Sequence, residues 1–258
     1  MEIKATMHKV FATMLAALLA IVPMMARAGQ EADIGAQFYQ QLAAQHKLVL
    51  QSPYYTILNP IAQRISAVAT PQYNHPFRFI LVNDKTPNAF SVPGGNVYVD
   101  TGLMTFVQNR EELAGVLCHE TSHTIHHDVM NLNRKAQGVN LAANVLSLLI
   151  GGGHNQIANT ILGMGAQLQD AHFSRNVEEA ADLKGAHTCA SAGYNPWGMV
   201  WLFQNFAKSD TGGGAEFLSD HPNNVHRIQR LEQLFASEPS TFRRFSPNIA
   251  SAKPLSRV

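Results

Sequence analysis

The sequence predicts a predominantly helical α+β fold with a small β-sheet beside one long helix. Two observations support this prediction. Apolar residues recur at helical spacing in several separate segments, of which residues 30–45 are the first. Only residues 77–99 are rich in β-branched and aromatic residues at strand spacing. One short run of strands among many helices is typical of the α+β class.

Two amphipathic helices precede the expected sheet. In residues 30–45, Ile34, Phe38 and Leu42 fall four apart and therefore share one helix face. Residues 57–68 repeat the helical spacing. Both segments are predicted to be packing elements.

The sheet is expected between residues 77 and 99. Phe77–Val82 and Asn88–Val92 are short extended runs. Pro93-Gly94-Gly95 then forms a turn signal before Val97–Val99, so the last two runs are predicted to form a hairpin.

A long helix should begin at Asn109. The side chain of an asparagine can accept from the backbone of the third helical residue, and that residue, Glu112, can reach back. Apolar residues at helical spacing follow, and we expect about five turns.

Further helices are expected downstream. Residues 140–150 and 157–168 are apolar segments separated by a triple glycine, and they are open to three interpretations: core, which we favour, a lid, or a membrane-contacting hairpin. Another helix near 177–192 ends at Gly193, and a new one starts at Trp197. The mixed tail from Phe242 onward is a candidate for poor order.

Composition and charge indicate one globular domain, residues 29–258. The chain has 258 residues, of which 46% are apolar and 14% are charged. The formal net charge is +1, the basic residues are scattered, and no glycine-rich phosphate loop is present. These features argue against nucleic acid as a partner.

Residues 1–28 have the features of a signal peptide. Lys4 and Lys9 precede an apolar stretch over residues 10–25, and Ala26-Arg27-Ala28 supplies small residues at the spacing of a cleavage site. Pro23 interrupts a stretch that is already short for a bilayer of about 30 Å. We therefore expect cleavage after Ala28 and export to a bacterial periplasm. No stable membrane anchor is expected, although peripheral membrane contact remains open.

The segment His119-Glu120-Thr121-Ser122-His123 carries the strongest chemical signal. Two histidines four residues apart share a helix face and can bind one metal ion. The glutamate between them is placed to act on a water that the metal activates. A catalytic zinc ion takes three protein ligands and keeps one position open, so a third ligand is needed.

Glu178 is the best candidate for that third ligand. His126 is on the same helix, but its backbone is about 10 Å from that of His119. A histidine six residues after His123 would fit another zinc-protease class, but Val129 stands there. Glu178 and Asp182 are four apart on a second predicted helix, and Asp182 can orient a ligand histidine. Glu179 points about 100° away and is disfavoured, while a solvated acidic face is the alternative.

The two cysteines, Cys118 and Cys189, are expected to be small core residues. A disulfide is the minority alternative, because Cys118 lies in mid-helix beside a candidate ligand, where its side-chain direction is already committed. Neither cysteine lies at the cleavage site, as a lipoprotein signal would require.

Taken together, these motifs resemble the gluzincin metallopeptidases of the HtpX, BepA and Oma type, which include the CAAX prenyl protease. The resemblance covers most of the chain from Glu31 to Leu234. Its motifs are, in order, Asn88–Gly95 with Thr101-Gly102-Leu103, the His119–His123 segment, Phe173-Ser174-Arg175 with Glu178-x-x-Ala181-Asp182, and Ser219-Asp220-His221-Pro222 with Arg227-Ile228.

The resemblance implies a zincin-like (minigluzincin) fold and one zinc ion held by His119, His123 and Glu178. Glu120 would be the general base. Asp182 would support a ligand histidine, and His221 would steady the oxyanion or fill the open zinc position. Arg227 is expected to anchor the loop of His221, and Arg175 to lie near the ligand helix. A turn-capping role for His221 is the simpler alternative.

The implied activity is a zinc endopeptidase with polypeptide substrates. Many relatives carry transmembrane helices, a lipid anchor or a C-terminal helical repeat. We expect none of these in the mature chain, and their membrane roles are not carried over. Residues 88–92 or 96–100 are expected to bind substrate as an added strand, which favours broad specificity for unfolded or misassembled proteins in quality control. The alternatives are a chaperone-like protein with a blocked zinc site and a zinc hydrolase of small amides or non-peptide substrates.

Overall fold

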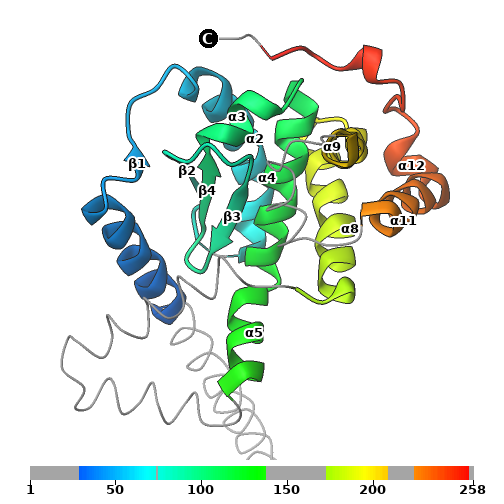
Figure 1. Cartoon of the computed structure of the whole chain (residues 1–258). Coiled ribbons are helices and arrows are strands. Elements are labelled where there is room, and N and C mark those ends of the chain that lie inside the picture. The colour runs from blue at the N-terminus through cyan, green and yellow to red at the C-terminus, as the bar shows by residue number, and fades with distance from the viewer. Residues whose placement is uncertain (1–28, 74, 138–172, 209–223, 256–258) are drawn as a thin grey trace, which may run out of the picture.

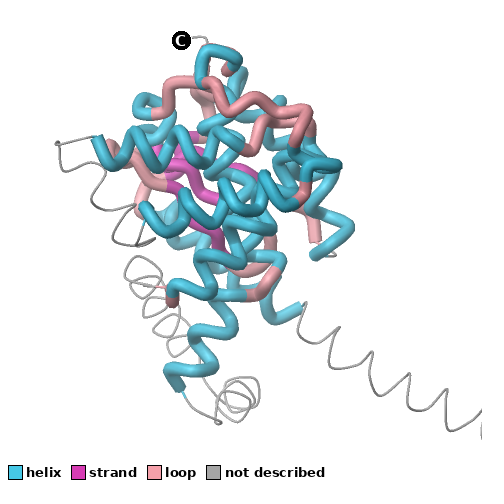
Figure 2. Tube along the Cα trace, turned by 90° about the vertical axis from the view of Figure 1, so that its right-hand side faces the viewer, coloured by secondary structure: helices cyan, strands magenta, loops and turns pink. Residues whose placement is uncertain are grey.

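The computed structural model describes residues 29–73, 75–137, 173–208 and 224–255. The expected signal peptide, the apolar segments 140–150 and 157–168, and His221 lie outside the described residues. Within the described ranges the structure is mostly helical with one small sheet, as the sequence predicts (Figures 1 and 2).

The sheet has four described strands in the order β1-β2-β4-β3. They are β1 (Leu48–Val49), β2 (Arg78–Val82), β3 (Ala89–Val92) and β4 (Asn96–Asp100). The predicted hairpin is confirmed, because β3 pairs antiparallel with β4 across a turn in which Gly94 and Gly95 have φ of 93° and 87°. Such values favour glycine. The parallel pairing of β2 with β4, which places β3 at an edge, was not expected from sequence.

Helices cover both faces of this sheet. An N-terminal helix spans residues 29–44, as expected. The others are α2 (Tyr55–Tyr73), α3 (Thr101–Phe106), α4 (Arg110–Ile125), α5 (Asp128–Gln137), α8 (Arg175–Ala192), α9 (Trp197–Lys208), α11 (Asn224–Ser237) and α12 (Pro239–Phe242). Figure 1 shows α4 running between the sheet and α8, with α11 and α12 beyond α8.

Alternation along the strands divides the apolar core. In β2, Phe79 and Leu81 join the large cluster formed with α2, α4, α8 and α9. Ile80 and Val82, on the opposite face, join a smaller cluster with Phe38 of the N-terminal helix. The sheet is therefore buried on both faces, and α4 is packed against the larger core.

The N-terminal helix is joined to the end of α4 by a buried polar contact. Glu31, which is 2% exposed, accepts from the hydroxyl of Tyr73 and lies 2.7 Å from Nδ1 of His127. The same tyrosine oxygen accepts from the backbone N–H of Gly94 in the hairpin turn at 2.9 Å. One carboxylate thus connects three separate segments.

Helix α4 begins at the predicted cap. Oδ1 of Asn109 accepts from the backbone N–H of Glu112 at 2.9 Å. The Glu112 carboxylate in turn accepts from the Asn109 side chain and from the backbone of Gln108. Burial raises the pKa of Glu112 even though these hydrogen bonds act in the opposite direction.

Helices α4 and α8 run antiparallel and approach closely. Glu178 lies beside His123 and His119, whereas Cys189, later in α8, lies beside Ala114, earlier in α4. At Gly185 between them, an added Cβ would stand 3.1 Å from the backbone nitrogen of His119. Glycine therefore permits this approach.

The expectation that Cys118 and Cys189 are unpaired core residues is wrong. They form a disulfide across α4 and α8, with Cα atoms 5.8 Å apart, and both are fully buried. The close approach at Gly185 brings the two cysteines within bonding distance, which the position of Cys118 within its own helix cannot show. The two cysteines are 71 residues apart in the sequence. A disulfide that closes a loop of this length stabilises a fold by about 4 kcal/mol in the chain-entropy estimate.

The tail is more ordered than expected as far as residue 255. Pro254 bridges to Asn109, and the backbone N–H of Arg110 donates to the carbonyl of Lys253. The backbone N–H of Lys253 donates to Glu111 at 3.0 Å. The tail therefore covers the start of α4. Among the helices described, none is both long enough and apolar enough to span a bilayer.

Replacing Asn109 with alanine should lower the free energy of unfolding by about 1–2 kcal/mol, because a buried helix start would lose its cap. Urea denaturation measures the loss. Asn248→Ala, which removes a cap from an exposed single 3-10 turn, is the matched control and should cost under about 0.5 kcal/mol. Equal losses at the two positions would contradict the importance of the α4 cap.

Candidate metal centre

The two histidines of α4 point their rings to one place. His119 and His123 are each 1% exposed. Their Nε2 atoms lie 3.0 Å apart, and the rings are nearly perpendicular at 89°. Two neutral imidazole nitrogens this close can bind one cation when the lone pairs of both face it.

Glu178 completes the cluster from the first turn of α8. Its Oε2 lies 3.5 Å from Nε2 of His119, and its Oε1 lies 3.5 Å from Nε2 of His123. Of the residues that the structure describes, these three form the one group whose ligand atoms could hold a metal ion, all within 4.8 Å of one another. Two histidines and a glutamate are the donor set of a catalytic zinc site, which leaves one position open.

Each histidine is oriented by a carboxylate on its other ring nitrogen. Nδ1 of His119 lies 2.9 Å from Oδ1 of Asp182. Nδ1 of His123 lies 2.9 Å from Oδ2 of Asp128. These contacts favour the tautomer that leaves Nε2 free to bind a metal, and they raise its basicity.

Asp128 was missed from sequence. It lies five residues after His123, a spacing that does not share a face on a continuous helix. In the structure the chain turns between α4 and α5 at His127, whose φ is 56°, and this turn carries Asp128 back beside the His123 ring. Only knowledge of that break could have indicated the contact.

Arg227 of α11 contacts both of the buried carboxylates of α8, Glu178 and Asp182. It is 3% exposed, and its Nε and Nη2 each donate to Asp182 at 2.6 Å. Its Nη1 lies 3.1 Å from Oε2 of Glu178. The expected contact with the loop of His221 lies outside the described residues.

The electrostatics of this cluster favour a cation. Burial alone would lower the pKa of Arg227, but Asp182, Glu178 and Glu120 outweigh it and raise that pKa above its ordinary value. Among the described residues, four buried carboxylates surround the histidine pair: Glu120, Asp128, Glu178 and Asp182. One guanidinium does not balance them, and a divalent ion would offset most of the excess negative charge.

Glu120 is buried on α4 between the two histidines and is 1% exposed. Its position places a carboxylate next to the face that the histidines share. Glu179, which the expected helix rotation directs away from the site, instead forms an ion pair with Arg230 near the surface. The neighbouring glutamates of α8 thus have separate environments.

The remaining candidates lie outside the buried cluster. Arg175 is exposed at the first residue of α8 and has no ion pair with any described residue. His126 is 31% exposed in its side chain and lies 3.9 Å from Asp128. Burial lowers the pKa of His126.

Phe173 stacks on the His123 ring with ring centroids 4.5 Å apart, a contact that sequence analysis did not anticipate.

Comparison with known proteins gives a consistent assignment. The model of Peptidase family M48 matches residues 55–235. The mitochondrial metalloendopeptidase OMA1 of Saccharomyces cerevisiae is 33% identical over 59% of this chain and 45% of its own length. The OMA1 of Schizosaccharomyces pombe is 31% identical over the same shares. A beta-barrel assembly-enhancing protease of Yersinia pestis is 28% identical over 75% of this chain and 41% of its own. The chain thus spans less than half the length of these relatives.

Replacing Arg227 with methionine should lower the free energy of unfolding of the metal-free protein by about 3 kcal/mol or more, because two buried carboxylates would lose their partner. Arg230→Met, which breaks the partly exposed pair with Glu179, should cost at most about 1 kcal/mol. Urea denaturation in the presence of a chelator compares them. Similar losses would show that Arg227 does not balance buried charge.

Replacing Asp128 with alanine should weaken metal binding by about 10- to 100-fold, because His123 would lose the carboxylate that orients it. Competition with a chromogenic chelator measures the dissociation constant, and circular dichroism checks the fold. Asp33→Ala, at an exposed position of the N-terminal helix, is the control and should leave the affinity unchanged. An Asp128→Ala affinity within twofold of wild type would exclude this role.

Proposed function

Because the chain belongs to peptidase family M48, we propose that it is a zinc endopeptidase that cleaves unfolded or misassembled proteins in the periplasm. The observation that carries this proposal is the convergence of His119, His123 and Glu178 from two helices. The carboxylates that contact Nδ1 of both histidines support the proposal further, because histidine ligands of metal ions are typically oriented by a carboxylate on the other ring nitrogen.

His119, His123 and Glu178 would hold the zinc ion. A bound zinc supplies a Lewis acid that polarises a carbonyl and makes water nucleophilic near neutral pH. Asp182 and Asp128 hold the two imidazoles, and Arg227 holds Asp182 and Glu178. The described elements α4, α5, α8 and α11 therefore all contribute to the site.

Glu120 would move the proton. Its carboxylate is buried and follows His119 directly in α4, beside the helix face that the histidines share, and it would accept a proton from the attacking water. The same group would then donate that proton to the amine that leaves. One carboxylate can serve both steps because the attacking oxygen and the leaving nitrogen are bonded to the same carbon of the substrate.

The substrate would bind as an extended strand along β3. Of the two segments considered from sequence, Asn96–Asp100 is β4, which lies between β2 and β3. Ala89–Val92 is β3, which is at the edge of the described sheet and packs against α4. Backbone pairing reads little side-chain sequence, and this supports broad specificity.

A periplasmic location rests on two features of the chain. Residues 1–28 have the charge, apolar stretch and small residues of a signal peptide, with cleavage after Ala28. The buried disulfide is of the kind that persists in an oxidising compartment. A role in protein quality control follows from broad specificity in that location.

Replacing Glu120 with glutamine should reduce casein cleavage by at least about 100-fold while one zinc ion per chain remains bound, because only the proton transfer is lost. Glu179→Gln, the neighbouring glutamate of α8 that pairs with Arg230, is the matched control and should retain wild-type cleavage. A chelator should abolish wild-type cleavage, and zinc should restore it. Cleavage that survives Glu120→Gln or the chelator would refute the mechanism.

A further inference from the structure

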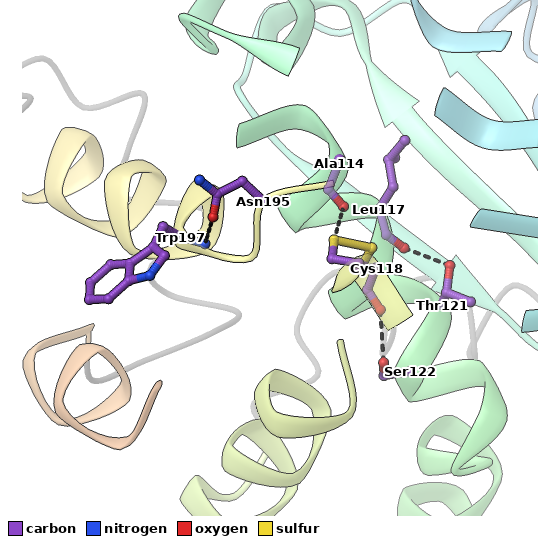
Figure 3. The surroundings of a disulfide bond; sticks show 8 residues. Ala114, Leu117, Cys118, Thr121, Ser122, Asn195 and Trp197 are labelled. Atoms are coloured by element: carbon purple, nitrogen blue, oxygen red, sulfur yellow. Dashed lines mark hydrogen bonds between the residues drawn. A yellow bond between two sulfur atoms is a disulfide. The ribbon is translucent and has the colours of Figure 1, made fainter. Parts of the chain in front are cut away.

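A covalent bond joins the two helices that carry the metal centre. Cys118 immediately precedes His119 in α4. Cys189 lies on α8, about three turns beyond Glu178. Figure 3 shows the disulfide at Cys118. The Cys189 sulfur lies 3.2 Å from the carbonyl oxygen of Ala114.

The residues of α8 that face α4 form a single stripe. Glu178, Asp182, Gly185 and Cys189 are spaced four, three and four apart, so they share one helix face. The first two contact the histidines, the third permits close approach, and the fourth is bonded to Cys118. A shift of α8 at the disulfide end is therefore transmitted along a rigid helix to Glu178.

Polar side chains of α4 beside the disulfide do not serve as a second link. The hydroxyl groups of Thr121 and Ser122 donate to the carbonyls of Leu117 and Cys118 within α4 itself (Figure 3). At Gly185 the backbone of α8 lies directly against the backbone of Cys118 and His119, with no side chain of residue 185 between them. A slide of α8 along this contact would displace Glu178 relative to the two histidines, whereas metal–ligand distances are kept within about 0.2 Å of their ordinary values.

We infer that Cys118 and Cys189 are positioning residues for the metal centre, and that their disulfide holds Glu178 and Asp182 in register with His119 and His123. This inference rests on the proposed zinc site. It goes beyond that proposal by assigning the metal affinity partly to a bond about three helical turns away from Glu178.

The bond also connects metal affinity with oxidation. Forming it removes one proton and one electron from each thiol, and a donor disulfide accepts them and becomes a dithiol. The chain would therefore reach its full affinity for zinc only after it meets such an oxidant. Because both cysteines are fully buried, this oxidation belongs to folding rather than to a reversible signal.

The test measures zinc dissociation constants by chelator competition for wild type and for the Cys118→Ala/Cys189→Ala double variant. The double variant should bind zinc at least tenfold more weakly. Ile80→Ala is the control, because it creates a cavity in the smaller core cluster, on the sheet face turned away from the large cluster that contains α4. It should stay within threefold of wild type, which separates loss of register from general loss of stability.

A second measurement applies if the double variant does not fold. Wild type is treated with a phosphine, which breaks the sulfur–sulfur bond: water supplies one oxygen to form the phosphine oxide and one proton to each sulfur. A thiol reagent then counts two free cysteines in the unfolded sample. The reduced protein should also bind zinc at least tenfold more weakly; new thiolate ligands would act in the opposite direction, because they add zinc donors.

The outcomes separate this inference from the proposed function. If wild type binds zinc and the disulfide-free forms stay within tenfold of it, the positioning role is overturned while the peptidase proposal stands. An equal loss of affinity in Ile80→Ala also overturns it. Wild type that binds no zinc would overturn both, and wild type that binds zinc without cleaving casein would overturn only the activity.

Discussion

The close antiparallel contact of α4 with α8 is the constraint on which the rest of the structure depends. At Gly185 a side chain would press on the backbone of His119, so the two helices meet nearly backbone to backbone. Two histidines on one helix can offer only two ligands on one face. The third ligand and one of the two orienting carboxylates must come from a neighbour at this short distance.

That contact carries an electrostatic cost. Carboxylates and histidines are buried together, and a buried charge is tolerated only with partners. Arg227 contacts both buried acidic residues of α8 at once, because a planar guanidinium can bond Asp182 with two nitrogens and still reach Glu178 with the third. The ring of Phe203 covers the guanidinium at 4.3 Å and completes its enclosure.

Local sequence patterns were sufficient to predict those features of the structure that lie within a single segment of the chain. The α4 cap, the hairpin at Gly94 and Gly95, and the facing pair Glu178 and Asp182 all follow from spacing within one element. Partners from other elements could not be read in this way. The disulfide depends on how closely α8 approaches α4, and Asp128 depends on a turn at His127. Helix α11 was not predicted at all, so the resemblance indicated Arg227 but not its contacts.

In the proposed zinc site, the ion would be part of the fold. Ligands that arrive from α4 and α8, and orienting carboxylates from α5 and α8, come together only in the folded chain. An ion that binds this state and not the unfolded chain stabilises it by about 4 kcal/mol at a thousandfold excess over its dissociation constant. The excess of buried carboxylates opposes folding when the ion is absent, while Arg227 and the disulfide limit how far the two helices can separate. In the proposed zinc site, the ion would offset most of the buried negative charge that Arg227 leaves unbalanced.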